Sequence, residues 1–282
     1  MPSGAAWKNL TANRQWLGIL MMTAEINIQC SVHVTGITDT GRARDHNEDA
    51  IAWDAPHGLA MLADGMGGHN AGDVASRLCL ETLNEVLQAA LDKPRHLRPN
   101  KGMSKHATLV RRSVNKANTV IFDNAAVNPE RKGMGTTLAM VLFYEDRAVV
   151  AHVGDSRVYR LRGGTLEQIT ADHSLVRELL EKGAISAEEA ENNPYRHVIT
   201  RAVGVRPRTV AEVQELEAQP GDVFLLCSDG LTDLVSDAVI EDTLVVAGGN
   251  WRCAAQRLID LANNSGGRDN ISVVIAALGG PC

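Results

Sequence analysis

Acidic residues stand where apolar, strand-like segments end, and this pattern constrains the fold of the 282-residue chain more than any other. Asp64 closes the apolar run that begins at Leu59 and is followed by Gly65, and Asp229 closes the run that begins at Val223. Each Asp-Gly step taken alone is ordinary turn chemistry. Repetition at several strand ends predicts that the carboxylates gather at one edge of a sheet, where they would repel one another without a bound cation.

The pattern recurs where other acids border apolar segments: Asp155 after 148–154, Asp269 before 271–277, and the pair Glu48 and Asp49 before 50–53. Neither histidine nor cysteine is arranged as a ligand set, and oxygen ligands suit magnesium or manganese. Two such ions can clamp a phosphoryl oxygen and activate water. Arg44, four residues before Glu48, is a candidate phosphate ligand, although in isolation it is an ordinary surface salt-bridge residue.

From about residue 31 the chain alternates strand-like and helical segments. Strands are predicted over 31–38, 58–63, 137–143, 147–153, 158–161, 166–169, 223–227 and 271–277. Amphipathic helices are predicted over 71–90, 107–126 and 254–263, and residues 171–200 form a charged, helix-forming segment without a strand. Short turns between neighbouring strands predict antiparallel hairpins, and hence one domain of mixed helices and strands.

Composition argues against several classes of protein. A net charge of −6 and an aromatic content of 4% disfavour a nucleic-acid binder, and no apolar run is long enough to span a membrane. The five cysteines are scattered without zinc-site spacing, which favours reduced thiols in the cytoplasm.

Residues 1–30 differ from the rest and carry no motif. The apolar run 16–22 follows Lys8 and Arg14, which makes a signal peptide conceivable, but the run is short and no typical cleavage site follows it closely. We expect a flexible extension, or translation that starts at Met21 or Met22.

Seven short blocks resemble, in order, those of the metal-dependent Ser/Thr protein phosphatases of the protein phosphatase 2C (PPM) class in their compact bacterial form. Each block alone is weak, but seven in the family order are specific, and they cover about residues 31–278. The blocks are Gly41–Asp49, Ala63–His69, Gly133–Thr137, Val153–Arg157, Thr170–Ser174, Cys227–Asp233 and Arg268–Ser272.

The resemblance implies an α+β fold, a four-layer αββα sandwich of two packed antiparallel sheets flanked by helices. It implies one phosphatase domain over residues 31–279, with a flap beside the active site at about 170–200. The implied activity is hydrolysis of phosphoserine and phosphothreonine in proteins by a metal-activated water. Two central Mn²⁺ or Mg²⁺ ions and a third, weaker one would serve as cofactors. We expect a cytoplasmic monomer that acts on phosphorylated proteins, opposes a separate Ser/Thr kinase that is itself among its partners, and binds neither nucleic acid nor membrane.

The resemblance also implies a role for each acid, and it makes Arg44 and Asp64 the catalytic candidates. Asp64 would bridge both central ions and Gly65 would offer its carbonyl oxygen. The remaining implied roles are Asp229 and Asp269 at the first ion, Glu48 and Asp49 at the second directly or through water, Asp155 with Asp229 at the third, and Arg44 at the substrate phosphate.

One position departs from the animal members of the family, which carry a histidine proposed as general acid where this chain has Met66. His69 and His173 lie nearby in sequence or in the flap, and neither is assigned as the acid. In the block 133–137 we interpret the glycines as allowing a close backbone approach and the threonines as capping residues.

Two other functions share parts of this pattern. A catalytically dead binding module on the same fold should have lost metal ligands, whereas Asp64, Asp229 and Asp269 are all present. A phosphodiesterase or nuclease could use the same two ions, but the net charge and the lack of a clear basic groove argue against it.

Overall fold

The computed structural model describes residues 31–67, 71–93, 98–191 and 193–279. The predicted extension 1–30 lies outside these residues. Among the described residues, no helix combines the length and the apolar character that crossing a bilayer requires.

Two antiparallel sheets form the centre of the molecule. One sheet has the order β1 (Val32–Asp39), β11 (Ile271–Leu278), β10 (Val223–Cys227), β7 (Arg157–Arg162) and β8 (Thr165–Gln168). The other has the order β2 (Asp49–Asp54), β3 (Leu59–Met66), β5 (Leu138–Tyr144), β6 (Arg147–Val153) and β9 (Glu212–Glu217), with the short β4 (Gly135–Thr136) paired to β3. Because β1 pairs with β11, the first and last described strands are neighbours.

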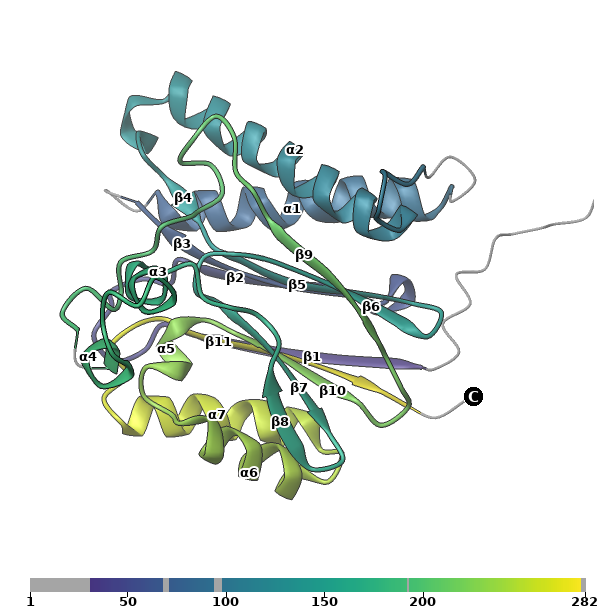
Figure 1. The fold of residues 1–282 in the computed structure, drawn as a ribbon, viewed down its shortest axis with the longest axis vertical. Coiled ribbons are helices and arrows are strands. Elements are labelled where there is room, and N and C mark those ends of the chain that lie inside the picture. The colour runs from purple at the N-terminus through teal and green to yellow at the C-terminus, as the bar shows by residue number, and fades with distance from the viewer. Residues whose placement is uncertain (1–30, 68–70, 94–97, 192, 280–282) are drawn as a thin grey trace, which may run out of the picture.

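Helices cover the outer face of each sheet, so the molecule has four layers (Figure 1). The pair α1 (Gly72–Leu91) and α2 (Lys105–Val127) lies over the sheet that contains β5. The pair α6 (Asp237–Ala247) and α7 (Trp251–Asn264) lies over the sheet that contains β10. The predicted αββα sandwich is therefore confirmed. Three further short elements are η1 (Ala55–His57), η3 (Pro129–Arg131) and α5 (Asp229–Thr232).

The central strands are buried on both faces, which explains their continuous apolar runs. Every residue of β5 is buried. Leu138, Met140 and Leu142 face the α1–α2 layer, while Ala139, Val141 and Phe143 face the other sheet, as the two-residue period of a strand requires. Between the sheets, Phe143 meets Phe224 edge to face with ring centroids 5.1 Å apart. A polar residue at the end of such a strand thus marks the point where the chain leaves the core.

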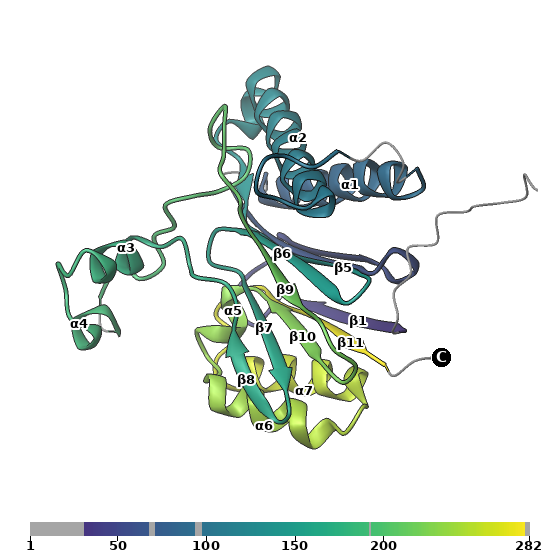
Figure 2. The same ribbon diagram turned by 45° about the vertical axis from the view of Figure 1, so that its right-hand side comes forward.

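The segment predicted to be charged and helical contains α3 (Leu175–Glu181) and α4 (Ala187–Glu191), which project from one edge of the sandwich (Figure 2). Its two ends meet, since Ser174 pairs with Ile199 in an isolated antiparallel bridge and Leu175 N–H donates to the Val198 carbonyl at 2.8 Å. We refer to residues 174–199 as the flap.

Several elements differ from the sequence prediction; β3, for example, continues through Asp64 to Met66. Strand β9 and helix α6 were not predicted, because each presents few residues to the core. β9 is an edge strand with no fully buried side chain, and α6 buries only Ile240 and Leu244 while Val245 and Val246 stay exposed. The helices over 71–90, 107–126 and 254–263 are present, with ends shifted by one to three residues.

Candidate metal centre

The acids singled out in the sequence converge at one end of the sandwich. In the β2–β3 ladder Asp49 stands opposite Asp64. Asp229 begins α5 just after β10, and Asp269 lies just before β11, the neighbour of β10. A cavity of about 510 Å³ opens there, which we call the acid cavity. Its lining includes the predicted residues Arg44, Glu48, Asp64, Gly65, Asp155, Asp229 and Asp269.

Asp49 lies behind the cavity wall and is buried, with 9% of its surface exposed. Its Oδ2 accepts hydrogen bonds from Ser228 Oγ at 2.9 Å and Ser272 Oγ at 2.6 Å, whereas its Oδ1 has no partner. Asp229 Oδ1 is likewise buried without a partner. A buried carboxylate oxygen without a hydrogen bond is costly, so both atoms are available to a cation.

Burial and mutual repulsion raise the pKa values of these acids. The pKa of Asp64 and that of Asp229 both lie well above the usual value, first because of burial and then because of neighbouring carboxylates. Burial is also the main reason that the pKa of Asp49 rises to about 6. Carboxylate oxygens alone, crowded and short of hydrogen bonds, are the donor set that a hard divalent cation such as Mg²⁺ or Mn²⁺ prefers. The residues present therefore fit the ions that the sequence predicted.

Only glycine fits after Asp64. A Cβ on Gly65 would lie 2.1 Å from the Gly72 carbonyl oxygen. The threonines of the block 133–137 hold the same strand end, since Thr137 Oγ1 accepts the Asp64 N–H at 3.0 Å and Thr136 Oγ1 donates to the Asp64 carbonyl at 2.8 Å. Their interpretation as capping residues is wrong: they fix the backbone on both sides of Asp64.

Glu48 joins the cavity to helix α1. Its Oε1 accepts the N–H of Gly72, the first residue of α1, at 3.2 Å and lies 3.3 Å from His46 Nε2. A carboxylate at a helix N-terminus is stabilised by the unpaired N–H groups there. The side chain predicted as a metal ligand thus also anchors a helix.

Arg44 reaches the cavity from the loop before β2. Its Nη2 donates to Asp269 Oδ2 at 2.7 Å, and both side chains are partly exposed. This hydrogen bond is the main reason that the pKa of Arg44 rises, so the guanidinium is cationic at every physiological pH. Sequence reasoning missed two further cationic side chains in the lining, Arg196 from the flap and Arg268.

Asp155 lies on the cavity wall, and burial raises its pKa to about 6. Its neighbour Arg157 turns away and pairs with Asp172, with Nε–Oδ1 at 3.0 Å and Nη2–Oδ2 at 2.8 Å. The hydrogen bonds of the Arg157 side chain go to Asp172 and Tyr159, so Arg157 does not pair with Asp155.

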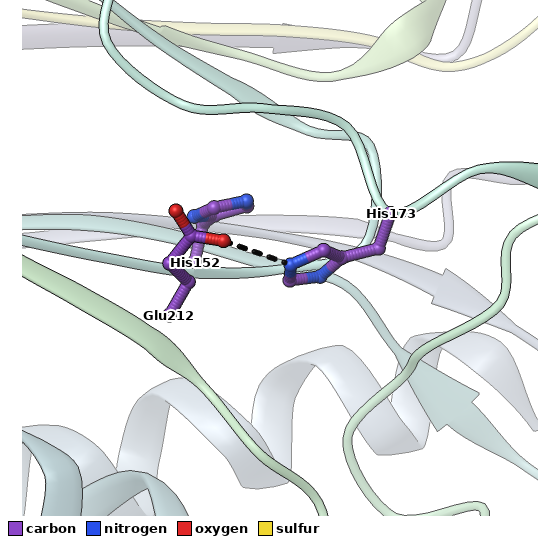
Figure 3. Close-up of side chains that lie close together, drawn as sticks. All are labelled: His152, His173 and Glu212. Atoms are coloured by element: carbon purple, nitrogen blue, oxygen red, sulfur yellow. Dashed lines mark ion pairs between the residues drawn. The ribbon is translucent and has the colours of Figure 1, made fainter. Parts of the chain in front are cut away.

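His152, His173 and Glu212 form a separate cluster whose ligand atoms lie within 4.8 Å of one another (Figure 3). The two imidazole rings stack with centroids 4.4 Å apart. His173 Nδ1 accepts the Gly154 N–H at 3.1 Å, so its Nε2 carries the proton and faces Glu212 Oε2 at 3.5 Å. In that tautomer His173 has no free lone pair for a metal. The cationic guanidinium of Arg201, whose Nη1 lies 3.2 Å from His173 Nε2, further disfavours a metal ion at this position.

The sequence assigns no general acid, so the positions of the histidines near the acid cavity are of interest. His173 is not part of the lining, and His69 lies outside the described residues. The lining instead includes His197 of the flap, whose Nδ1 is 3.1 Å from Asp233 Oδ2. Sequence reasoning had no signal for this contact, because it depends on how the flap folds back.

A family model described as Protein phosphatase 2C matches residues 40–257. A serine/threonine phosphatase stp of Listeria welshimeri is 37% identical over 252 residues, which cover 86% of this chain and 95% of the relative. The chain belongs to the protein phosphatase 2C family. The serine/threonine protein phosphatase PstP of Mycobacterium tuberculosis is 40% identical over 243 residues, and the match spans 85% of this phosphatase but 43% of PstP.

Solved structures agree with this membership. The crystal structure of M. tuberculosis PstP superposes with a TM-score of 0.77 at 38% identity and covers 88% of this phosphatase and 99% of the solved chain. A second structure, the catalytic domain of PstP in complex with two manganese ions, gives a TM-score of 0.75 at 38% identity, covering 88% and 98%.

Proposed function

We propose that the acid cavity is the catalytic centre of this enzyme. The chain is a metal-dependent protein-serine/threonine phosphatase and acts on phosphorylated proteins. The convergence of carboxylates from both sheets, with buried oxygens of Asp49 and Asp229 left unpaired, carries the assignment of the site. Manganese or magnesium is the cofactor, and the two manganese ions in the related PstP structure support a pair of central ions here.

Each acid then receives the role that the family resemblance implies. Asp64 would lie between the two ions, and Gly65 would present its carbonyl oxygen. Asp229 and Asp269 would complete the protein ligands of the first ion, while Glu48 and Asp49 would serve the second directly or through water. Asp155, which lines the same cavity as Asp229, would hold a third and weaker ion.

When bound, such ions neutralise the charge of phosphoryl oxygens and lower the pKa of a water molecule, so that it can lose a proton and attack phosphorus at neutral pH. Arg44 would grip the substrate phosphate through its planar guanidinium, which suits two phosphate oxygens at once. In hydrolysis a bond forms between the water oxygen and phosphorus, the bond from phosphorus to the Ser or Thr oxygen breaks, and that oxygen takes up a proton. Met66 lines the cavity and offers no proton.

The cellular setting is also a proposal. The sequence contains no kinase motif, so the opposing Ser/Thr kinase would be a separate protein and one of the phosphorylated substrates. The scattered cysteines favour the cytoplasm. We propose that the enzyme works as a monomer and binds neither nucleic acid nor membrane. A comparison of phosphorylated Ser and Thr sites in cells with and without the gene tests the kinase proposal: the kinase should gain phosphate in the deletion strain.

We propose that residues 31–279 form a single phosphatase domain and that residues 1–21 are dispensable. The pairing of β1 with β11 supports this boundary, because it joins the two ends of the domain in one ladder. Protein that begins at Met22 should hydrolyse phosphoprotein at the full-length rate. Loss of activity with an intact fold would give the first residues a role.

A chelator experiment tests the catalytic centre. The protein should release phosphate from a small aryl phosphate and from a phosphothreonine peptide only with manganese or magnesium, and excess chelator should abolish both reactions. A phosphodiester serves as the control substrate. Metal-dependent cleavage of the diester at a rate similar to that of the peptide would favour the nuclease alternative, and binding of phosphoprotein without turnover would favour a binding module.

A further inference from the structure

A second cavity of about 430 Å³ adjoins the acid cavity. Met66 and Ile199 line both, so they form the boundary between the two. We call this second cavity the basic groove. The rest of its lining comes from the chain that leaves the flap: Thr200, Arg201, Ala202, Val205, Arg206, Arg208, Thr209 and Val210.

The basic groove has the opposite charge to the protein as a whole. Its lining contains three arginines and no carboxylate, in a chain of net charge −6. Arg206 and Arg208 are exposed, and no carboxylate of the residues that the structure describes lies within 4.0 Å of either guanidinium. The acidic flap helices α3 and α4 project away from the sandwich (Figure 2). Two cationic side chains therefore face solvent unpaired beside the catalytic centre.

The backbone of the basic groove is held in place. Asn118 of α2 accepts the Gly204 N–H at 2.8 Å and donates to the Arg206 carbonyl at 3.0 Å. Val203 exchanges both backbone hydrogen bonds with Thr136 of β4. Gly204 has φ +91° and is packed so that a Cβ would lie 2.1 Å from Ile121. A surface fixed in this way loses little conformational entropy when it binds a partner.

We propose that the basic groove binds acidic side chains that flank the phosphorylated residue of a protein substrate. Opposite charge recruits such a segment, and exposed Val205 and Val210 supply apolar contact for its other side chains. A peptide whose phosphate lies in the acid cavity would pass over Met66 and Ile199 into the groove. The proposal deepens the proposed function and rests on it, since it names the substrate class of that same site.

Matched peptides test the proposal. One set carries phosphothreonine flanked on either side by Asp and Glu, and the other set replaces these residues with Asn and Gln. We expect kcat/KM to favour the acidic set by roughly three- to tenfold at low salt, as a few exposed ion pairs allow, and to lose the preference at high salt. In the double variant Arg206→Gln/Arg208→Gln the preference should vanish.

The exposed arginines of α7 provide the matched control. The double variant Arg252→Gln/Arg257→Gln makes the same change of charge in the helix layer over the other sheet. This control should keep the preference. Hydrolysis of an aryl phosphate, which is too short to reach the groove, reports the catalytic centre separately, and its absence in the unchanged enzyme would refute the proposed function itself. Equal rates on both peptide sets, or a preference that survives in the groove variant or disappears in the α7 control, would overturn the proposal.

Discussion

Two sets of polar side chains lie close together in the fold yet differ in how their charges are balanced. In the acid cavity, burial and then the charges of neighbouring carboxylates raise the pKa of Asp64 and that of Asp229. In the neighbouring set, which we call the paired cluster, Arg157 holds Asp172 through three hydrogen bonds of 2.8–3.2 Å and His152 stacks on His173. The paired cluster is complete as folded, whereas the acid cavity needs a ligand from outside.

The two sets therefore respond oppositely to the loss of a charge. Removing one member of a pair leaves its partner uncompensated and destabilises the fold. Removing one carboxylate from a repelling set relieves the fold and damages only the binding of the cation. The following predictions test this contrast, from the largest expected effect to the smallest.

Asp229→Asn should lower turnover on the order of a thousandfold, a loss comparable to that of an essential charge-stabilising group in other active sites. In chelator the same variant should unfold at a higher temperature than the unchanged protein, because one repelling charge is gone. Turnover with manganese and thermal unfolding with chelator are the measurements. A variant with near-normal turnover would refute the two-ion site.

The stability of the metal-free protein should fall as pH rises from about 4 to above 6. A carboxyl whose pKa is raised by folding binds its proton more tightly in the folded state, so its full penalty appears only above the folded pKa. For Asp49, whose pKa rises to about 6, the penalty is about 3 kcal/mol. Denaturant titrations with chelator at several pH values measure it, and added manganese should remove the decline. A flat profile without metal would mean that burial and repulsion do not raise the pKa values of these carboxyl groups.

Asp155→Ala should retain the two central ions and lose most of its turnover, about tenfold or more, by analogy with loss of a group that supports a metal site. Calorimetric metal titration beside steady-state rates distinguishes this outcome from general damage. Loss of every bound ion, or full rates at limiting manganese, would refute the assignment of a third ion to Asp155.

Arg44→Ala should raise KM for an aryl phosphate by about three- to tenfold with a smaller fall in kcat, because the guanidinium contacts phosphate in both the ground state and the transition state. Arg42, exposed on the same loop but absent from the cavity lining, gives the matched control variant Arg42→Ala. Unchanged constants would make Arg44 only the ion-pair partner of Asp269.

Asp172→Asn should destabilise the protein by about 1–2 kcal/mol and leave metal stoichiometry unchanged, since it leaves the partly exposed Arg157 without its charged partner. Denaturant midpoints and metal titration measure the two effects. A change in metal binding would mean that the acid cavity and the paired cluster are not independent.

Of the two sets, the sequence predicts mainly the acids of the acid cavity. The ends of apolar runs reveal Asp64 and Asp229 because a doubly buried strand is a continuous apolar run, and β10 has the bounds that were predicted. The partners of Asp49 could not be predicted in this way. Ser272 belongs to β11 and Ser228 directly follows the adjacent strand β10, and only the packing of the two sheets brings them to Asp49.

Elements that contribute little to the core were also not predicted, because their sequences lack a strong apolar pattern. Strand β9 alternates weakly and lies at a sheet edge, so its sequence has no strong periodic signal. Arg196 and His197 reach the acid cavity through the path of the flap, which no local pattern encodes. Sequence patterns thus predict the residues that face the core or end an apolar run. The other residues of the site come together only through tertiary contacts.

The bridge between Ser174 and Ile199 has a consequence for engineering. Because the flap leaves and rejoins the sandwich at one point, its closure depends only weakly on the length of the chain between these residues, since loop-closure entropy grows slowly with length. The flap is therefore a place where foreign sequence can be inserted or exchanged between relatives while the sheets stay as they are. A ligand-sensing domain inserted there would place hydrolysis at the acid cavity under the control of a chosen small molecule.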